Sequence, residues 1–285
     1  FHDAIHHLYK PYEGKPFPSS EAHSLAANDA LILQHLNNAF AVNLFHYPAK
    51  DKDGHDINYG TSNGKPFQLN GTQLINRHVI KQFIINQIEA DAQMASQLER
   101  EGGYWQIISQ EKQYTTMHKG ILLGGIIDRL DLLAPPSGNR IRIVDYKTSS
   151  KPHSAKTLTE LFDPERCADN YHIMQILYYC MVLTAPQSVH HDNTVVPALM
   201  YCAKDYGNNP SGIVKLTPLD RGKKEEMTDY LTQYGEEFHA LLTQKIDEIF
   251  TPYHTDTRLG TFVQCADEKN CAYCDFLNLC RRHPE

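Results

Sequence analysis

No apolar run in this 285-residue sequence is long enough to cross a membrane. The longest ones, at 121–127 and 176–183, are far shorter than the about 20 residues that a transmembrane helix needs. Basic residues are also too few to dominate the surface, because 27 Lys and Arg stand against 34 Asp and Glu and leave a net charge of −7. A uniformly basic nucleic-acid-binding coat is therefore excluded, whereas a local basic groove is not.

The first residues, Phe1-His2-Asp3, contain neither an initiator Met nor the basic and apolar regions of a signal peptide. The missing Met suggests a fragment of a longer protein, and processing or trimming of the chain explains it equally well. The seven cysteines do not suggest a disulfide framework, because a chain of this size can bury a core without covalent staples. Four of them crowd into 265–280, which favours a reducing, cytoplasmic environment and a metal site near the C-terminus.

The composition is that of a globular protein, with 41% hydrophobic and 21% charged residues and a mean hydropathy of −0.48. Apolar spacing predicts, in chain order, helices at 1–9, 28–45 and 72–100, strands at 104–117, 121–133 and 140–146, a helix at 170–183, strands at 195–203 and 212–216, and a helix at 219–250. Thr72 is the expected cap of the third helix, and Gly102-Gly103 end it. This order predicts one α/β domain with a helical N-terminal layer.

The residues that carry chemistry lie in two runs, GGIIDRLD at 124–131 and IVDYKT at 143–148. Asp128 and Asp145 each sit in an apolar strand, and side-chain alternation puts Lys147 on the same face as Asp145. A short hairpin would bring Asp128 against that face. Two carboxylates beside a lysine form an oxygen-rich site suited to Mg²⁺, which lowers the pKa of a bound water and neutralises charge on a phosphate.

A simpler interpretation makes Asp128 and Arg129 a surface pair and lets Asp145 begin a loop. However, an Asp between Ile or Val residues costs folding free energy unless it is paired or coordinated. The apolar neighbours of both aspartates therefore favour a functional site.

The two runs resemble the GxxDRxD…xxVDYKT motifs of the PD-(D/E)XK nuclease superfamily, and the resemblance extends over most of the chain. The most similar branch is the nuclease domain of the RecB and AddB helicase-nucleases and their cysteine-bearing relatives. The resemblance implies a restriction-endonuclease-like core, with a mixed central sheet flanked by helices, and metal-dependent hydrolysis of DNA in repair or recombination. It also implies that Asp128 and Asp145 hold Mg²⁺ or Mn²⁺ with the Tyr146 backbone carbonyl, while Lys147 serves the attacking water.

The opening run FHDAIHHLY at 1–9 resembles the first helix of that branch, whose histidine joins the metal site. Aligning the two assigns this role to His2. His6 and His7 compete for it, and an exposed helix histidine is the simpler alternative. His2 and His6 also have the i, i+4 spacing of a zinc pair, although no Glu completes the metalloprotease pattern.

The run QILYY at 175–179 resembles the Gln-x-x-x-Tyr helix beside the family's active site, which implies catalytic or DNA-positioning roles for Gln175 and Tyr179. Taken alone, Tyr178 and Tyr179 are typical core aromatics. Glu111 stands where relatives often carry an acidic residue, and a solvated strand-edge Glu explains it equally well.

The cysteine-rich tail has the spacing Cys265-x5-Cys271-x2-Cys274-x5-Cys280. C-x2-C spacing lets two thiolates chelate one metal centre, and the flanking cysteines complete four ligands. The last three resemble the C-terminal triplet of the family's iron–sulfur branch, whose fourth cysteine lies upstream of the opening histidine. Cys265 is a local substitute for it. A [4Fe–4S] cluster, a zinc ion and cysteines that only pack remain the alternatives.

These observations predict a single nuclease domain over 1–285, with a helical layer at 1–103, a catalytic core at 104–217, and a long helix with a cysteine-rich latch at 218–285. The expected partners are single- or double-stranded DNA and a helicase-like region or subunit of the same system, with no membrane. The basic residues near the core that suit local phosphate contacts are Lys151, Lys156, Arg281 and Arg282.

The competing hypothesis is a catalytically inactive DNA-binding or scaffold module with the same fold, part of a larger helicase-like protein. Intact Asp128, Asp145 and Lys147 argue for the enzyme, because a degenerate copy would be free to lose them.

Overall fold

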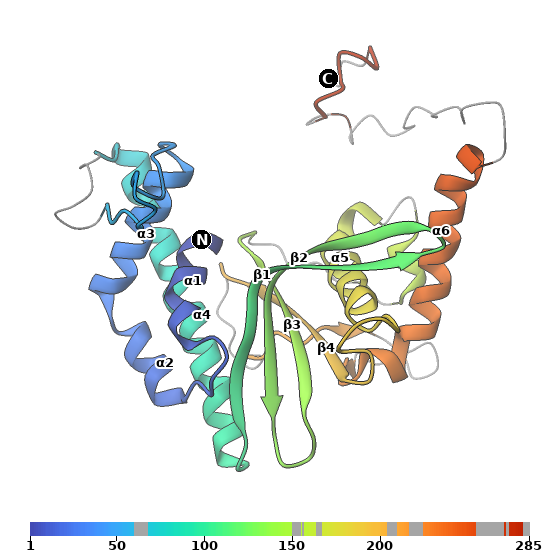
Figure 1. The fold of residues 1–285 in the computed structure, drawn as a ribbon, viewed down its shortest axis with the longest axis horizontal. Coiled ribbons are helices and arrows are strands. Elements are labelled where there is room, and N and C mark those ends of the chain that lie inside the picture. Colours follow the sequence, from blue (N-terminus) through green and yellow to red (C-terminus); the bar gives the residue numbers. More distant parts are fainter. Residues whose placement is uncertain are drawn as a thin grey trace. The chain divides into compact units, whose positions relative to one another are not determined.

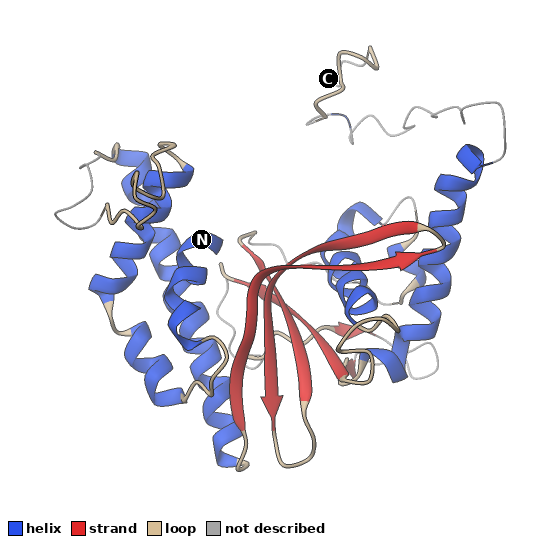
Figure 2. Ribbon diagram, viewed as in Figure 1, coloured by secondary structure: helices blue, strands red, loops and turns tan. Residues whose placement is uncertain are grey.

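The computed structural model places helices around a bent, four-stranded sheet (Figures 1 and 2). The residues that it describes are 1–59, 68–149, 155, 157–163, 167–203, 210–216, 225–254, 271 and 274–281. The chain divides into two compact units, 1–239 and 240–285. The sheet and every helix before α6 belong to the first unit.

Four helices precede the sheet: α1 (His2–Tyr9), α2 (Ser19–Ala26), α3 (Asp29–Asn43) and α4 (Gly71–Arg100), with a 3-10 turn at Lys10–Tyr12. The Asn28 side chain accepts a hydrogen bond from the Leu31 backbone N–H and caps α3, which agrees with the predicted start of that helix at residue 28. The predicted cap of α4 at Thr72 is wrong by two residues. Asn70 accepts a hydrogen bond from the Gln73 backbone N–H, and the Gln73 side chain bonds back to Asn70, so the capping box fixes the start there.

Helix α2 was not predicted from the sequence. It is only eight residues long, and its apolar positions, Ala22, Leu25 and Ala26, are small or few. They become buried by packing against α4, which is a tertiary effect that local periodicity does not report.

The strands lie in chain order in the sheet: β1 (Tyr104–His118), β2 (Ile121–Ala134), β3 (Arg140–Lys147) and β4 (Thr194–Tyr201). The first three run antiparallel, and Lys119 and Gly120, both with positive φ, form the two-residue turn of the β1–β2 hairpin. β4 pairs parallel with β3 after the crossover helix α5 (Cys167–Leu183). The predicted mixed α/β fold is confirmed, with a sheet between the N-terminal helices and α5 (Figure 1).

The predicted continuous helix at 219–250 is wrong. A short strand, β6 (Glu225–Glu226), pairs antiparallel with β5 (Lys215–Leu216), so the backbone is extended at 225–226, and residues 217–224 lie outside the described residues. The helix begins with a π-helical turn at Leu231–Gly235 and continues as α6 (Glu236–His254).

Candidate active site

The two aspartates of the sequence motif meet where the pairing of β2 with β3 ends. The register sets Arg129 opposite Val144, so the preceding residue, Asp128, stands across from Asp145. Asp145 is 2% exposed within β3, which rules out the interpretation that it begins a loop. Asp128 Oδ2 accepts a 2.8 Å hydrogen bond from the Tyr146 backbone N–H, which ties the two strands together at the carboxylates.

Lys147 lies beside Asp145 on the same face, with Nζ 2.5 Å from Asp145 Oδ2. The ammonium also donates to Gln175 Oε1 at 2.8 Å, and Gln175 Nε2 donates to the Tyr179 hydroxyl at 2.9 Å. One side of α5 therefore holds the lysine through a chain of two hydrogen bonds. Gly125 makes room for this chain, because a Cβ there would come within 2.7 Å of the Tyr179 ring.

His2 approaches the aspartates from the start of α1. Its Nε2 is 3.3 Å from Asp128 Oδ2 and 3.2 Å from the Tyr146 carbonyl oxygen. The hydrogen bond to Asp128 raises the pKa of His2, outweighing the opposing effect of burial. His7, a competitor for this position, instead has its Nδ1 2.8 Å from the Asp3 carbonyl oxygen and 3.2 Å from the Asp3 carboxylate.

Burial dominates the electrostatics of the carboxylates. It raises the pKa of Asp145 to about 6, and the negative charge of Asp128 adds to the shift while Lys147 opposes it. Burial and the charge of Asp128 also raise the pKa of Glu111. Glu111 adopts a φ of 46°, a conformation that is uncommon for a residue with a side chain and that bends β1 beside the aspartates.

The donor set suits a hard divalent cation. It offers two carboxylates, a backbone carbonyl and an imidazole, and Asp145 Oδ2 is a buried oxygen that accepts no hydrogen bond of normal geometry. The ligand atoms of His2, Asp128 and Asp145 do not all lie within 4.8 Å of one another. Coordination by all three therefore requires a local adjustment, including movement of Lys147 away from Asp145.

A cavity of about 830 Å³ adjoins this site. His2 and Glu111 form part of its wall, and apolar side chains of α3 and α4 such as Phe40 and Ile80 form much of the rest. Asp128 and Asp145 are not among the residues that line it, so the cavity reaches the site through His2 and Glu111.

A second acidic cluster, Asp51, Asp53 and His55, lies in an exposed loop. The Asp51 carboxylate accepts hydrogen bonds from the backbone N–H groups of Asp53 and His55, so the turn itself explains the arrangement. This exposed cluster is therefore not evidence for a metal site.

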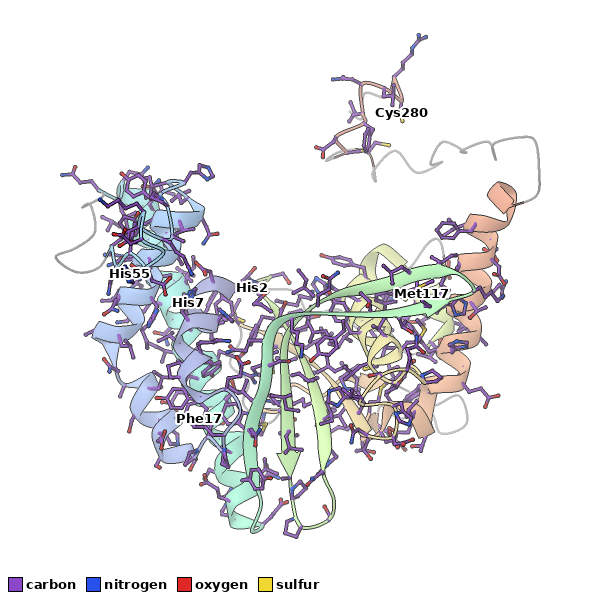
Figure 3. The ribbon with its side chains drawn as sticks, in the orientation of Figure 1. His2, His7, Phe17, His55, Met117 and Cys280 are labelled. Carbon is purple, nitrogen blue, oxygen red and sulfur yellow. The ribbon has the colours of Figure 1, made fainter. Side chains whose placement is uncertain are left out.

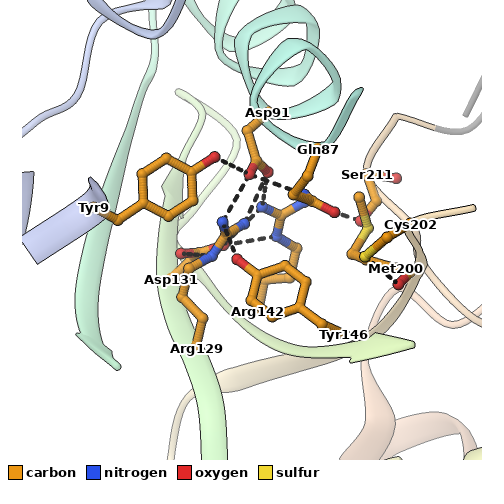
Figure 4. Close-up of polar contacts among 10 residues, drawn as sticks. All are labelled: Tyr9, Gln87, Asp91, Arg129, Asp131, Arg142, Tyr146, Met200, Cys202 and Ser211. Carbon is orange, nitrogen blue, oxygen red and sulfur yellow. Dashed lines mark hydrogen bonds and ion pairs between the residues drawn. The ribbon is translucent and has the colours of Figure 1, made fainter. Parts of the chain in front are cut away.

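Sequence reasoning missed a buried charged network on the opposite face of the sheet, shown in Figure 4. Asp91 of α4 binds Arg129 in a bidentate pair and also contacts Arg142, and Asp131 accepts from both arginines. All four side chains are 0% exposed. The signal was present in the sequence, since Arg129, Asp131 and Arg142 alternate with apolar residues in strands where a charged group requires a partner.

The network corrects the interpretation of Asp128 and Arg129 as a surface pair. Alternation along β2 turns the two side chains to opposite faces, and Arg129 Nη1 donates to the Tyr146 hydroxyl at 2.6 Å. Tyr9 of α1 donates to Asp91 at 2.8 Å. The network therefore links α1 and α4 to the strand positions next to Asp128, Asp145 and Lys147.

The cysteine tail is described only in part. Cys265 lies outside the described residues, as do Lys151, Lys156 and Arg282. The sulfur atoms of Cys271, Cys274 and Cys280 do not all lie within 4.8 Å of one another, so these three do not form a preassembled ligand group.

None of the described helices is long and apolar enough to span a membrane. No curated protein matches this chain significantly. The family model of the PD-(D/E)XK nuclease superfamily matches residues 1–281, which is nearly the whole sequence. The chain, with its mixed sheet and its paired aspartates followed by a lysine, belongs to the PD-(D/E)XK nuclease superfamily.

Proposed function

We propose that this protein is a divalent-metal-dependent deoxyribonuclease that hydrolyses phosphodiester bonds. The observation that carries the proposal is the placement of Lys147 Nζ 2.5 Å from Asp145, across the strand pair from Asp128. Two carboxylates in a largely buried site repel each other, and the raised pKa of Asp145 reflects that repulsion together with burial. A bound cation relieves the same repulsion, so the site favours metal binding once Asp145 is ionised.

Each residue has a role in this proposal. Asp128, Asp145, His2 and the Tyr146 carbonyl would hold Mg²⁺ or Mn²⁺, which supplies Lewis-acid stabilisation and a more acidic bound water. Lys147 orients the attacking water and stabilises the negative charge that develops on the phosphate. Gln175 and Tyr179 fix the direction of the ammonium through their hydrogen bonds. Glu111 is the candidate for a further acidic group at the same site, because the charge of Asp128 acts on it.

DNA as the substrate, and repair or recombination as the setting, are proposed from the sequence resemblance to the RecB and AddB nuclease domains. The same resemblance supports a helicase-like region or subunit as a partner, and one nuclease domain over 1–285. All the proposed catalytic residues lie in the first compact unit, residues 1–239.

A cleavage assay tests the proposal. The purified protein should degrade fluorescent single- or double-stranded oligonucleotides with Mg²⁺ or Mn²⁺ and stop when EDTA is added. Asp145→Ala should abolish this activity and preserve the melting transition. Equal cleavage by Asp145→Ala would contradict the proposal. DNA binding without any metal-dependent cleavage would favour the inactive DNA-binding module.

We also propose that the tail cysteines bind a [4Fe–4S] cluster, with zinc as the alternative. The C-x2-C unit and the resemblance to the iron–sulfur branch support this. Anaerobically purified protein should then show broad visible absorption that disappears on oxidation, and Cys274→Ser should lower the melting temperature, because ligand binding free energy is also folding free energy. A colourless protein with stoichiometric zinc would favour zinc. A metal-free wild-type protein, with an unchanged melting temperature in Cys274→Ser, would leave only the alternative in which these cysteines pack without binding a metal.

A further inference from the structure

Tyr146 lies between Asp145 and Lys147 in β3, but its side chain points to the other face of the sheet. Alternation along the strand places the Asp145 and Lys147 side chains at the candidate active site and turns the Tyr146 ring away from it. On that opposite face Tyr146 is 4% exposed and belongs to the charged network that Figure 4 shows. The backbone of Tyr146 therefore links the network covalently to the site.

The backbone of Tyr146 contacts two side chains of the site. β2 and β3 pair only as far as Arg129 and Val144. Beyond this pair, the Tyr146 N–H donates to the Asp128 carboxylate at 2.8 Å, and the Tyr146 carbonyl oxygen is 3.2 Å from His2 Nε2. His2 reaches this carbonyl from the start of α1, between that helix and the sheet (Figure 3). Side chains thus take the place of a strand partner at the peptide groups of Tyr146.

The side chain of Tyr146 is held at its far end by Arg129. Arg129 Nη1 donates to the Tyr146 hydroxyl at 2.6 Å, and the guanidinium lies over the ring, with Cζ 5.5 Å from the ring centroid. Arg129 is itself fixed by its two hydrogen bonds to Asp91 of α4. A rotation of the β3 backbone at Tyr146 would swing the ring and stretch its bond to this anchored group. The hydroxyl bond therefore restrains the direction of the adjoining N–H and C=O groups.

The ring of Tyr146 also supports His2. The two rings pack edge to face, with their centroids 6.0 Å apart and an angle of 67° between their planes. Tyr146 therefore contacts the imidazole with its ring as well as with its carbonyl oxygen, and it holds Asp128 with its N–H. Three of the groups that we propose as metal ligands meet at this one residue.

We propose that Tyr146 is a positioning residue of the metal site, in which the hydrogen bond from Arg129 to its hydroxyl keeps its N–H directed at Asp128 and its carbonyl directed at the cation. The inference rests on the proposed function, in which Asp128 and this carbonyl hold the cation. It gives the buried network a role in metal affinity as well as in stability, because groups that orient metal ligands strengthen binding without touching the ion.

Tyr146→Phe tests the proposal, because it removes one oxygen atom and leaves the backbone carbonyl in place. Calorimetric titration with Mn²⁺ at pH 8, well below the melting temperature, measures the affinity of the folded protein. The Kd for Mn²⁺ should rise about tenfold, the lower end of the range for groups that orient metal ligands. In the cleavage assay, kcat at a fixed, subsaturating Mn²⁺ concentration should fall while KM for the oligonucleotide stays unchanged.

Tyr9→Phe is the matched control. The Tyr9 hydroxyl donates to Asp91 at 2.8 Å, and the Arg129 guanidinium lies over its ring as well, with Cζ 5.2 Å from the ring centroid. Burial raises the pKa of both tyrosines, so each Phe removes a neutral hydroxyl from the same network. Tyr9, however, lies at the opposite end of α1 from His2. Both variants should lower the melting temperature, since each loses a buried hydrogen bond, but only Tyr146→Phe should weaken Mn²⁺ binding.

Two results would overturn the inference alone. One is a Kd for Mn²⁺ in Tyr146→Phe within about twofold of the wild-type value, which is too small a change for a group that orients a ligand. The other is an equal loss of affinity in Tyr9→Phe, because the network would then act on the whole fold rather than through Tyr146.

The wild-type protein separates this inference from the function on which it rests. If it binds Mn²⁺ but cleaves no DNA, the proposed function fails, and the comparison of the two Phe variants still decides the role of Tyr146. If it binds no Mn²⁺, both the proposed function and the inference are wrong.

Discussion

Asp91 and Arg129 form a bidentate ion pair between α4 and β2, with Nη1–Oδ2 and Nη2–Oδ1 distances of 2.7 and 2.8 Å. Both side chains are 0% exposed. Arg129 is adjacent in sequence to Asp128, so this pair fixes the strand segment that presents one of the two site aspartates. Burial alone would raise the pKa of Asp91, but Arg129 and Arg142 outweigh it and lower the pKa to about 2.

Asp91→Asn should destabilise the protein strongly. The substitution leaves two buried arginines with one carboxylate, and breaking a buried ion pair in this way costs about 3–5 kcal/mol. Urea unfolding at pH 7 measures the effect. Glu89→Gln, on the same helix, removes a largely exposed pair with His23 and should change stability by less than about 0.5 kcal/mol. A similar decrease in the free energy of unfolding in both variants would show that the buried network stabilises the protein no more than a surface pair does.

Asp145→Asn should stabilise the metal-free protein at neutral pH. The folded pKa of about 6 lies above the ordinary value of 3.8, so the folded state binds the proton more tightly and loses stability as the pH rises between these two values. Above about pH 6 the full penalty, on the order of 1–3 kcal/mol, is present, and the amide avoids it. Melting curves in EDTA from pH 4 to pH 8 measure the effect. The melting temperature of the variant should exceed that of the wild type by an amount that grows up to about pH 6 and then levels off. A difference that is constant over this range would contradict a raised pKa.

Lys147→Met should slow cleavage on the order of a hundredfold to a thousandfold while leaving metal binding at pH 8 intact. The ammonium contacts Asp145 and Gln175 but is not itself a metal ligand, and Met keeps much of the bulk of the side chain. Calorimetric Mg²⁺ titration and single-turnover cleavage together check this. Cleavage within about threefold of wild type would make Lys147 a bystander.

Gly125→Ala should impair cleavage through Tyr179. The added methyl would come within 2.7 Å of the ring, so either the ring or the β1–β2 hairpin must shift, at a cost of about 1–3 kcal/mol in stability. The shift breaks the hydrogen-bond chain from Tyr179 through Gln175 to Lys147. Single-turnover rates and urea unfolding measure the two effects. Gly71→Ala is a suitable control, because nothing lies within 4 Å of the added atom and Gly71 does not have a positive φ. A normal cleavage rate in Gly125→Ala would show that the position of Tyr179 does not affect cleavage.

Local patterns in the sequence are enough to predict the four strands of the main sheet and to mark the two aspartates. Asp128 and Asp145 each interrupt an apolar strand, and a charged residue there requires a partner or a ligand, so their apolar neighbours favour a functional site. The alternation of β3 placed Lys147 beside Asp145, and the order of helices and strands determined the mixed α/β class. These features depend on local periodicity and on the energetic cost of burying charge, and both can be recognised in the amino-acid sequence.

The partners of these residues depend on how distant segments of the chain pack together. Asp91 lies 38 residues before Arg129, and nothing in its helix indicates that it meets the arginines of β2 and β3. The positions of His2 and Gln175 against the aspartates likewise depend on how α1 and α5 pack. Within the helix expected at 219–250, residues 225–226 are instead extended, because their backbone pairing with β5 outweighs the local helical periodicity. Contacts between distant segments are set by the packing of the whole core, which a pattern in a short window does not contain.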